Sequence, residues 1–330
     1  ATDVIIYSEV EADPPEAVVL RAAQFAREAK ITGVIGLGGG SSLDVAKLIS
    51  VLACSDHDLN ELLKSIYGID LITGPRLPLI QVPTTAGTGS EVTPISIVTT
   101  GEAQKTGIVS KRLLPDYAIL DAQLTVGLPA HVTAATGVDA MVHAIEAYSS
   151  KNKKNPYSDM LAKQALQMLS RNIRRVVQDG SDLAARQEML LGSMLAGQAF
   201  ANAPVAAVHA LAYPLGGHFH VPHGLSNSLV LPPVLRFNAK VVPGLYAELL
   251  DVIKPDHAPS STKEKCDQFI MELESIIDDV ALPKTLRECG VGRQDLPTLA
   301  SDAMLQQRLL INNPVAVNEQ DALEIYNSVY

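Results

Sequence analysis

Positive charge is in short supply in this sequence. Lysine and arginine total 26 against 36 aspartates and glutamates, which gives the 330-residue chain a formal net charge of −10. An acidic chain has no bulk electrostatic attraction for phosphate backbones, so nucleic acid is not an expected partner. Long apolar runs are lacking too, and none reaches the ~18–20 residues that a membrane helix needs. The first residues also lack the basic and apolar segments of a secretory signal, so we expect no association with a membrane.

Cysteine is scarce, and its positions exclude a disulfide framework. Cys54, Cys266 and Cys289 are odd in number, far apart and outside any CxxC pair. Glycine and proline, with 22 and 20 residues, fall far below the range of low-complexity chains. The hydrophobic fraction of 47% is enough for a sizeable core. These values predict a reduced, cytoplasmic, globular enzyme, and the length suggests two domains.

The two parts of the chain differ in their periodicity. In the first, short apolar runs alternate with helical patterns, which predicts an α/β domain with a Rossmann-like parallel sheet over residues 1–127. The expected strands are 33–38, which we expect to be buried, 77–82, 91–99, 108–109 and 117–120. Beyond Pro129 strand signals nearly vanish, which predicts an all-α domain over 128–330. Its expected helices are 130–149, 156–178, 182–202, 222–236, 240–252, 261–280 and 319–329.

A glycine turn joins the first expected strand to a helix over 41–50, whose start has capping-box spacing at Ser41 and Asp44. Glycine lets the backbone approach a ligand closely, and a helix N-terminus offers free N–H groups and the positive end of its dipole. Such a turn suits a phosphate group. The GxGxxG fingerprint does not fit, because Ser41 stands where its last glycine belongs, and a purely structural turn is the alternative.

A second loop, over 83–93, also suits a polar ligand. It holds the hydroxyl side chains of Thr84, Thr85, Thr88 and Ser90 between two expected strands. Taken alone, it would be an ordinary Gly/Thr loop. The two loops strengthen each other, because ligands of open α/β sheets bind at the carboxyl ends of strands.

The histidines give the sharpest chemical signal. Asp139 and His143 are four residues apart in an apolar stretch, so on a helix they share a face. A buried carboxylate and a buried imidazole each need a partner, and a metal ion meets that need. Four more histidines lie between 209 and 223, among glycines and prolines that predict a tight bend able to bring His209 and His223 together. One carboxylate and several imidazoles suit Fe²⁺ or Zn²⁺ without distinguishing them, and an exposed histidine-rich loop is the alternative.

Five motifs in order make the chain resemble the iron-containing (group III) alcohol dehydrogenases. They are GLGGGSSLDVAK, PTTAGTGSEVT, PDYAILD, LPAHVTAATGVDAMVHAIEAY and HALAYPLGGHFHVPHGLSNSLVLPPVLRFN, and NEQDALEIYNSVY resembles the family's last helix. The resemblance covers nearly all of the chain and implies a dehydroquinate synthase-like architecture. The family's initial strand–helix unit is missing from this sequence, so the choice between NAD and NADP cannot be read.

The resemblance implies the site residues by position. The metal ligands would be Asp139, His143, His209 and His223, with His218 and His220 outside the set. Cofactor contacts would come from Gly39, Gly40, Ser41 and Asp44 in the first motif, from Thr84, Thr85 and Thr88 in the second, and from Lys105 and Leu124. Tyr213 is a departure, because many members have histidine there. Its hydroxyl could contact substrate or transfer a proton, and the alternative is packing alone, with Pro214 ending the helix.

These residues predict a metal-dependent, homo-oligomeric dehydrogenase. It would transfer hydride between a primary alcohol or small diol, or the matching aldehyde, and NAD or NADP, with Fe²⁺ or Zn²⁺ as the metal. A cyclising lyase of the dehydroquinate synthase type is the rival enzyme. It needs basic residues for an acidic phosphorylated substrate, and neither 131–148 nor 205–229 contains lysine or arginine. An inactive metal-binding fragment is the remaining alternative.

Overall fold

The computed structural model describes residues 3–101, 104–256, 258 and 261–330, and its chain divides into two compact units. Unit 1 comprises Ala1–Thr84 and Ser90–Asp121, and unit 2 comprises Thr85–Gly89 and Ala122–Tyr330. The domain boundary expected at 127–128 lies inside unit 2 and stays a prediction. No helix in the described ranges is both long and apolar enough to span a bilayer.

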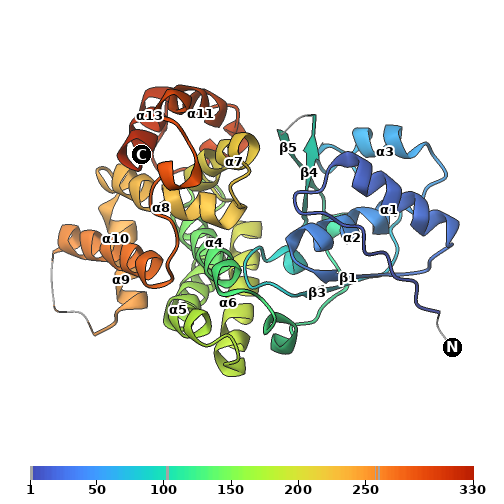
Figure 1. Cartoon of the computed structure of the whole chain (residues 1–330), viewed down its shortest axis with the longest axis horizontal. Helices are drawn as coiled ribbons and strands as arrows, with labels where there is room; N and C mark the ends of the chain where they lie inside the picture. Colours follow the sequence, from blue (N-terminus) through green and yellow to red (C-terminus); the bar gives the residue numbers. More distant parts are fainter. Residues whose placement is uncertain (1–2, 102–103, 257, 259–260) are drawn as a thin grey trace. The chain divides into compact units, whose positions relative to one another are not determined.

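Unit 1 is an α/β unit with two small sheets (Figure 1). One sheet is parallel and consists of β1 (Val34–Gly38), β3 (Leu79–Pro83) and β6 (Tyr117–Ala118), with β3 in the middle. The other joins β2 (Gly68–Ile69) in parallel to β5 (Gln104–Val109), which pairs antiparallel with β4 (Ile95–Thr100). The predicted fold class is therefore confirmed, with an antiparallel pair in addition. The strand expected from residue 91 begins only at Ile95, because Ser90–Val92 forms a 3-10 turn. The hydroxyls of Ser90 in this turn and of Thr93 after it accept hydrogen bonds from the buried Lys47.

The core of unit 1 forms around α2 (Gly40–Leu52), which contacts strands of both sheets. The helices α1 (Glu16–Glu28) and α3 (Leu59–Ser65) pack beside it. Their apolar faces meet those of β4 and β5, and the core residues include Val19, Ala22, Val45, Leu48, Leu52, Val98 and Ile108. Burial of these aliphatic side chains is the main stabilising term of this unit.

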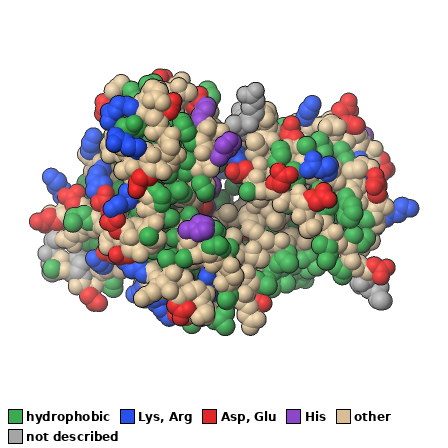
Figure 2. Space-filling view, in the orientation of Figure 1, with side chains coloured by type: hydrophobic (Ala, Val, Ile, Leu, Met, Phe, Trp, Pro, Cys, Tyr) green, Lys and Arg blue, Asp and Glu red, His purple; other side chains and the backbone are tan. Residues whose placement is uncertain are grey.

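β1 is covered on one face only, so the prediction of a buried strand is wrong. Gly36 faces α2, where an added Cβ would lie 2.8 Å from the Cβ of Ala46. Ile35 and Leu37 point the other way and are 65% and 58% exposed. Tyr117 on β6 is also exposed. Figure 2 shows hydrophobic side chains gathered on the surface over β1 and β3. The continuous apolar run at 33–38 predicted that both faces of the strand are covered. Alternate side chains of a strand face opposite ways, and only the face of Gly36 is covered here.

The regular secondary structure of unit 2 is helical in all its described residues, as predicted. Its helices are α4 (Ala130–Ser149), α5 (Pro156–Gln178), α6 (Leu183–Asn202), α7 (Ala207–Phe219), α8 (His223–Ala239), α9 (Pro243–Ile253), α10 (Thr262–Asp279), α11 (Leu296–Ala303), α12 (Gln307–Leu310) and α13 (Glu319–Ser328). The central helix α4 packs against α5, α6 and α8 (Figure 1). It is buried without interruption from Gly137 to Ser149. A polar side chain on this stretch is therefore removed from water and requires a partner.

The predicted bend in the histidine-rich segment exists and lies between α7 and α8. α7 continues through Pro214 to Phe219, so the helix does not end at Pro214 as the alternative for Tyr213 assumed. Proline removes one hydrogen bond and strains the preceding turn, and the packing of α7 against α8 and α11 outweighs that cost. The chain reverses at His220, whose φ of 53° and ψ of 27° are left-handed, and α8 starts after Pro222.

Candidate metal centre and cofactor loops

The four predicted metal ligands converge inside unit 2. Asp139 and His143 share one face of α4, His209 lies in the first turn of α7, and His223 begins α8. One ligand atom from each lies within 4.8 Å of the ligand atoms of the others. Oδ1 of Asp139 is 3.9 Å from Nε2 of His209 and 3.7 Å from Nε2 of His223. Ligand atoms around one tetrahedral ion lie about 3.4 Å apart, so a single cation can reach all four.

Glycine at two positions lets other backbone segments approach α4. Gly224 directly follows His223, and an added Cβ there would lie 2.3 Å from the carbonyl oxygen of Ala135 on α4. Gly87 packs on the same helix, because its Cβ would lie 2.7 Å from Cβ of Thr136. The carbonyl oxygen of Gly87 is 3.2 Å from Nδ1 of His143. Close backbone packing therefore brings His223 to the ligand set and gives His143 a hydrogen-bond partner.

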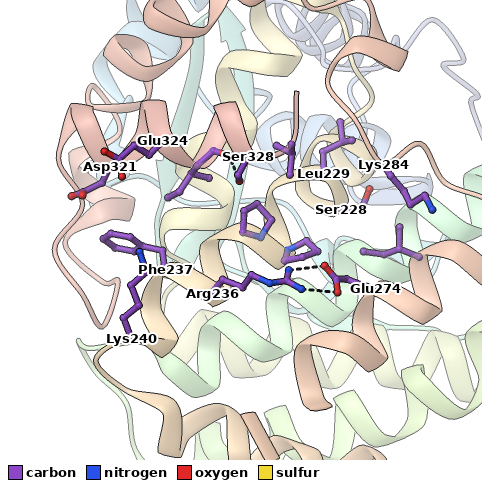
Figure 3. A pocket seen from close by; sticks show the side chains of 15 residues that line it. Ser228, Leu229, Arg236, Phe237, Lys240, Glu274, Lys284, Asp321, Glu324 and Ser328 are labelled. Atoms are coloured by element: carbon purple, nitrogen blue, oxygen red, sulfur yellow. Dashed lines mark hydrogen bonds and ion pairs between the residues drawn. The ribbon is translucent and has the colours of Figure 1, made fainter. Parts of the chain in front are cut away.

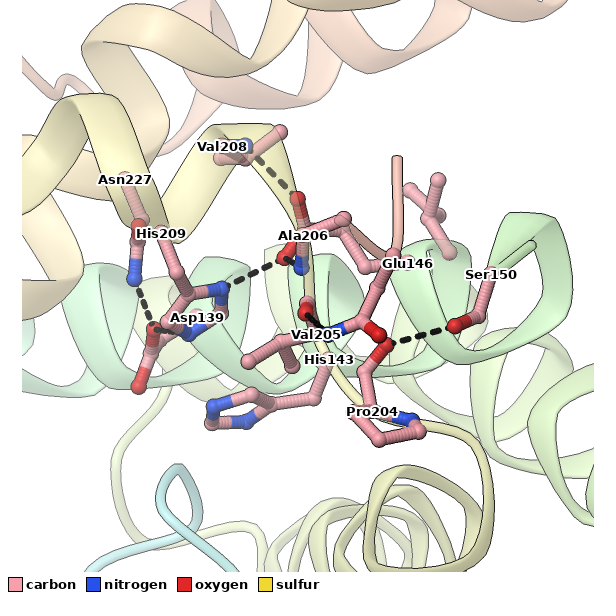
Figure 4. Close-up of polar contacts among 12 residues, drawn as sticks. Asp139, His143, Glu146, Ser150, Pro204, Val205, Ala206, Val208, His209 and Asn227 are labelled. Carbon is pink, nitrogen blue, oxygen red and sulfur yellow. Dashed lines mark hydrogen bonds and ion pairs between the residues drawn. The ribbon is translucent and has the colours of Figure 1, made fainter. Parts of the chain in front are cut away.

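Hydrogen bonds from the surrounding residues orient the predicted ligands (Figure 4). Oε2 of Glu146 lies 2.6 Å from Nδ1 of His209. Nδ2 of Asn227 donates to Oδ1 of Asp139 at 2.6 Å. Metal-binding imidazoles and carboxylates are commonly held in this way by groups behind them.

Burial leaves the centre with acceptors that a cation would satisfy. Nε2 of His209 and Oδ1 of Asn227 are buried without a hydrogen-bond partner. Burial lowers the pKa of His143 to about 3, against the attraction of Asp139, so its imidazole is neutral at pH 7. Burial alone would raise the pKa of Asp139, but the three imidazoles and Asn227 outweigh it and hold that pKa below its usual value. A carboxylate with three imidazoles fits a divalent transition metal such as Fe²⁺ or Zn²⁺.

The glycine turn of unit 1 lies at the carboxyl end of β1, as predicted. β1 ends at Gly38, and α2 starts at Gly40 after Gly39 as the N-cap. Ser41 is therefore inside the first helical turn, and the predicted capping box is wrong. The carboxylate of Asp44 instead accepts hydrogen bonds from the Ser90 hydroxyl at 2.6 Å and from the N–H of Ile97 at 2.9 Å.

The other predicted cofactor residues are divided between the units. The N–H of Thr84 donates to the carbonyl of Gly38 at 2.9 Å, so this loop starts beside the glycine turn in unit 1. Thr85 and Thr88 belong to unit 2. In unit 1, Nζ of Lys105 lies 2.6 Å from Oδ1 of Asp13. Leu124, in the 3-10 turn Ala122–Thr125 of unit 2, is 42% exposed.

Unit 2 contains a cavity of about 620 Å³ (Figure 3). It lies among α8, α10 and α13, and none of the predicted site residues lines it. Arg236 at its wall is held by both carboxylate oxygens of Glu274, at 2.6 and 2.8 Å. The predicted chemistry therefore does not depend on this cavity.

Known protein families account for both parts of the chain. Residues 133–330 match the model of the Fe-containing alcohol dehydrogenase family, C-terminal, and residues 1–122 match that of iron-containing alcohol dehydrogenase. The chain belongs to the iron-containing alcohol dehydrogenase family. The resemblance inferred from the motifs is confirmed.

Individual relatives of this iron-containing alcohol dehydrogenase align with almost its whole length. Long-chain-alcohol dehydrogenase 1 of Geobacillus thermodenitrificans is 44% identical over 98% of this chain and 82% of its own. The crystal structure of 1,3-propanediol oxidoreductase is 37% identical, has a TM-score of 0.94 and covers 99% of this chain and 85% of its own. Sulfoacetaldehyde reductase of Bifidobacterium kashiwanohense, solved in complex with NAD⁺, is 27% identical with a TM-score of 0.85, over 98% of this chain and 82% of its own.

The predicted reaction class is confirmed with the family. The protein is an oxidoreductase that transfers hydride between an alcohol or aldehyde and a nicotinamide cofactor. This favours the dehydrogenase prediction over the cyclising lyase.

Tyr213 of this dehydrogenase lies one turn after His209, and its ring centroid is 5.9 Å from that of His223. Burial raises the pKa of the Tyr213 phenol, and the neighbouring Arg308 guanidinium, hydrogen-bonded to it, opposes the shift. Arg308 comes from α12, with its guanidinium carbon 6.0 Å from the centre of the tyrosine ring. The fold thus places the Arg308 guanidinium near Tyr213, although the segments 131–148 and 205–229, which carry the predicted ligands, contain no lysine or arginine.

Three residues around the centre escaped the sequence analysis. Glu146 is seven residues after Asp139 and Asn227 is four after His223, so helical spacing places each on the same face as a predicted ligand. That periodicity could have found them. Arg308 is remote from every motif, and only the packing of α12 against α7 reveals it.

Proposed function

We propose that Asp139, His143, His209 and His223 bind one Fe²⁺ ion, with Zn²⁺ as the alternative. The convergence of these four side chains around buried, unpartnered Nε2 of His209 carries the proposal. When bound, such an ion supplies Lewis-acid polarisation of a substrate oxygen. The neutral His143 imidazole offers its lone pair at pH 7, and the Asp139 carboxylate contributes negative charge. The Tyr213 hydroxyl would contact the substrate.

The cofactor proposal is NAD, with NADP as the alternative, because a relative has been solved with NAD⁺. Gly39, Gly40 and Ser41 would bind the diphosphate at the start of α2, where backbone N–H groups and the helix dipole favour anions. Asp44 would support that turn through Ser90 and Ile97. The remaining contacts would come from Thr84, Thr85, Thr88, Lys105 and Leu124.

The substrate proposal is a primary alcohol or small diol, or the corresponding aldehyde. It is supported by relatives named for long-chain alcohols and for 1,3-propanediol. We also expect a cytoplasmic homo-oligomer.

Metal titration combined with turnover tests the proposed function. Metal-free enzyme would receive Fe²⁺ without oxygen, or Zn²⁺, and be assayed for bound metal and for NADH formation with ethanol, 1,3-propanediol and 1-decanol. Asp139→Ala should lose the metal and at least about a thousandfold in kcat, which corresponds to about 4 kcal/mol.

His218→Ala is the matched control, because His218 bonds to Asp302 outside the four ligands. It should keep both metal and turnover. A wild-type enzyme without stoichiometric metal, or an Asp139→Ala variant that binds it equally well, would contradict the assignment.

A further inference from the structure

A buried carboxylate lies behind the predicted metal ligands. Glu146 is 3% exposed on α4, and it accepts three hydrogen bonds (Figure 4). Its donors are the N–H of Ala206 at 2.9 Å, the N–H of Val208 at 2.6 Å and Nδ1 of His209 at 2.6 Å. No lysine or arginine of the described chain forms an ion pair with it. Its partners are therefore the start of α7 and the ring of one predicted ligand.

The three contacts determine which nitrogen of His209 carries hydrogen. Backbone N–H groups only donate, so both oxygens of Glu146 must act as acceptors. With the carboxylate oxygens as acceptors, the 2.6 Å contact to Glu146 is a hydrogen bond in the His209 tautomer that carries its hydrogen on Nδ1. Nε2 is then the lone-pair nitrogen. It is the buried atom without a partner, 3.9 Å from Oδ1 of Asp139.

The same carboxylate also fixes the backbone that carries His209. Ala206 is the N-cap of α7 and has no side chain able to cap it. Glu146 reaches across from α4 and accepts from the N-cap and from Val208, one residue before the histidine. The position of the α7 backbone and the orientation of the His209 ring thus depend on one group.

We propose that Glu146 is a positioning residue of the metal centre, which presents the Nε2 lone pair of His209 to the ion without touching ion or substrate. This inference rests on the proposed ligand set. Hydrogen-bond partners behind a ligand of this kind commonly change metal affinity by about 10–100-fold. The competing interpretation is that Glu146 only caps α7.

Glu146→Gln tests the two interpretations together with a control for a lost cap. Glutamine keeps the size, and its oxygen can still accept from the N–H of Val208, whereas an NH₂ group in place of Oε2 loses the bond from Ala206. Its NH₂ group would instead donate to Nδ1 and favour hydrogen on Nε2, which blocks that lone pair. We expect the affinity for Co²⁺ to fall by about 10–100-fold. The visible d–d spectrum of the Co²⁺ enzyme should change as well. Glu146→Asp retains an acceptor-only group and should recover part of the affinity.

Asp182→Ala is the control for a lost helix cap, because alanine has no side-chain acceptor. Asp182 caps α6 through the N–H of Ala185 at 2.9 Å and contacts none of the predicted ligands. This variant should lower Tm while leaving the Co²⁺ affinity and spectrum unchanged. If Glu146→Gln behaves in the same way, Glu146 is only a cap and the proposal is overturned.

A measurement on the unsubstituted protein keeps the test independent of how the variants fold. The ¹⁵N–¹H spectrum of metal-free enzyme, with His209 assigned by substitution, should show hydrogen on Nδ1. Hydrogen on Nε2 would overturn the proposal. Failure of the ligand set has a different signature, because the wild-type enzyme would then bind no Co²⁺, or Asp139→Ala would bind it normally.

Discussion

Each unit contains a buried polar cluster, and the two differ in how far their groups satisfy one another. In unit 1, the fully buried Lys47 donates to the hydroxyls of Ser90 and Thr93 at 2.7 and 3.2 Å and to the carbonyl of Ile95 at 2.6 Å. Oδ1 of Asp44 lies 3.4 Å from its Nζ. In unit 2, three imidazoles surround Asp139, and Nε2 of His209 has no partner.

The difference separates a structural cluster from a candidate ligand site. The Lys47 ammonium group has acceptors on several sides, so its hydrogen bonds are satisfied by residues of unit 1 alone. Around Asp139 the acceptors point toward one another, and only a cation could bind several of them at once. Burial alone does not distinguish these cases, because Lys47 in one cluster and Asp139, His143 and His209 in the other are all buried.

The largest expected effect comes from breaking the cluster in unit 1. Lys47→Met keeps the length of the side chain but leaves Asp44 as a carboxylate without its cation. Removing one partner of a buried ion pair commonly costs about 3–5 kcal/mol, so the free energy of unfolding in urea should fall by that amount. Metal affinity should stay unchanged, because the ligands belong to unit 2. A loss of metal with intact stability would mean that the contrast between the clusters is wrong.

A smaller effect concerns Glu91, whose buried Oε1 has no hydrogen-bond partner. Burial raises the pKa of Glu91 to about 7, against its backbone hydrogen bond and Lys47. A raised folded-state pKa means that the folded protein holds this proton more tightly than the unfolded chain. The resulting stability is present below about pH 4.5 and is lost as pH rises through 7.

Glu91→Gln should therefore gain stability relative to the wild type between pH 5 and pH 8. The gain should be on the order of 2–3 kcal/mol, because the amide has no charge to bury. Urea unfolding of both proteins at the two pH values measures it. A difference that stays constant across this range would show that Glu91 titrates normally.

The sequence predicts the metal ligands better than their surroundings, for a physical reason. Asp139 and His143 share a helix face, so local periodicity identifies that pair. The approach of His223 depends on Gly224 packing against Ala135, a contact between distant segments that no local pattern encodes. The capping box failed because α2 already starts at Gly40, which places Ser41 inside the helix, and Asp44 accepts from Ser90 and Ile97 in distant segments.

Two of the cofactor residues were harder to predict than the metal ligands, because no local sequence pattern marks them. Lys105 and Leu124 came from the family resemblance alone, without a local pattern of their own. In the structure Lys105 pairs with Asp13 and Leu124 lies in a different unit. Their roles remain predictions.

The smallest expected effect tests how far the centre in unit 2 extends beyond its ligands. Tyr213→Phe removes only a hydroxyl and should lower kcat by up to about tenfold, or about 1.4 kcal/mol. Metal content should not change, because the phenol is outside the ligand set. Tyr213→His should retain activity. The matched control is Tyr326→Phe, whose hydroxyl donates to the carbonyl of Leu211 on α7 and should affect stability alone.

The pH profile shows which role the Tyr213 hydroxyl has. Burial raises its pKa above the ordinary value despite Arg308, so the phenol stays protonated at neutral pH and donates a hydrogen bond rather than acting as a base. Tyr213→Phe should then lower the plateau of kcat without changing the shape of the profile between pH 6 and 9. A changed shape would show that the phenol itself titrates. Unaltered kinetics at every pH would restrict the centre to its four ligands and the residues that orient them.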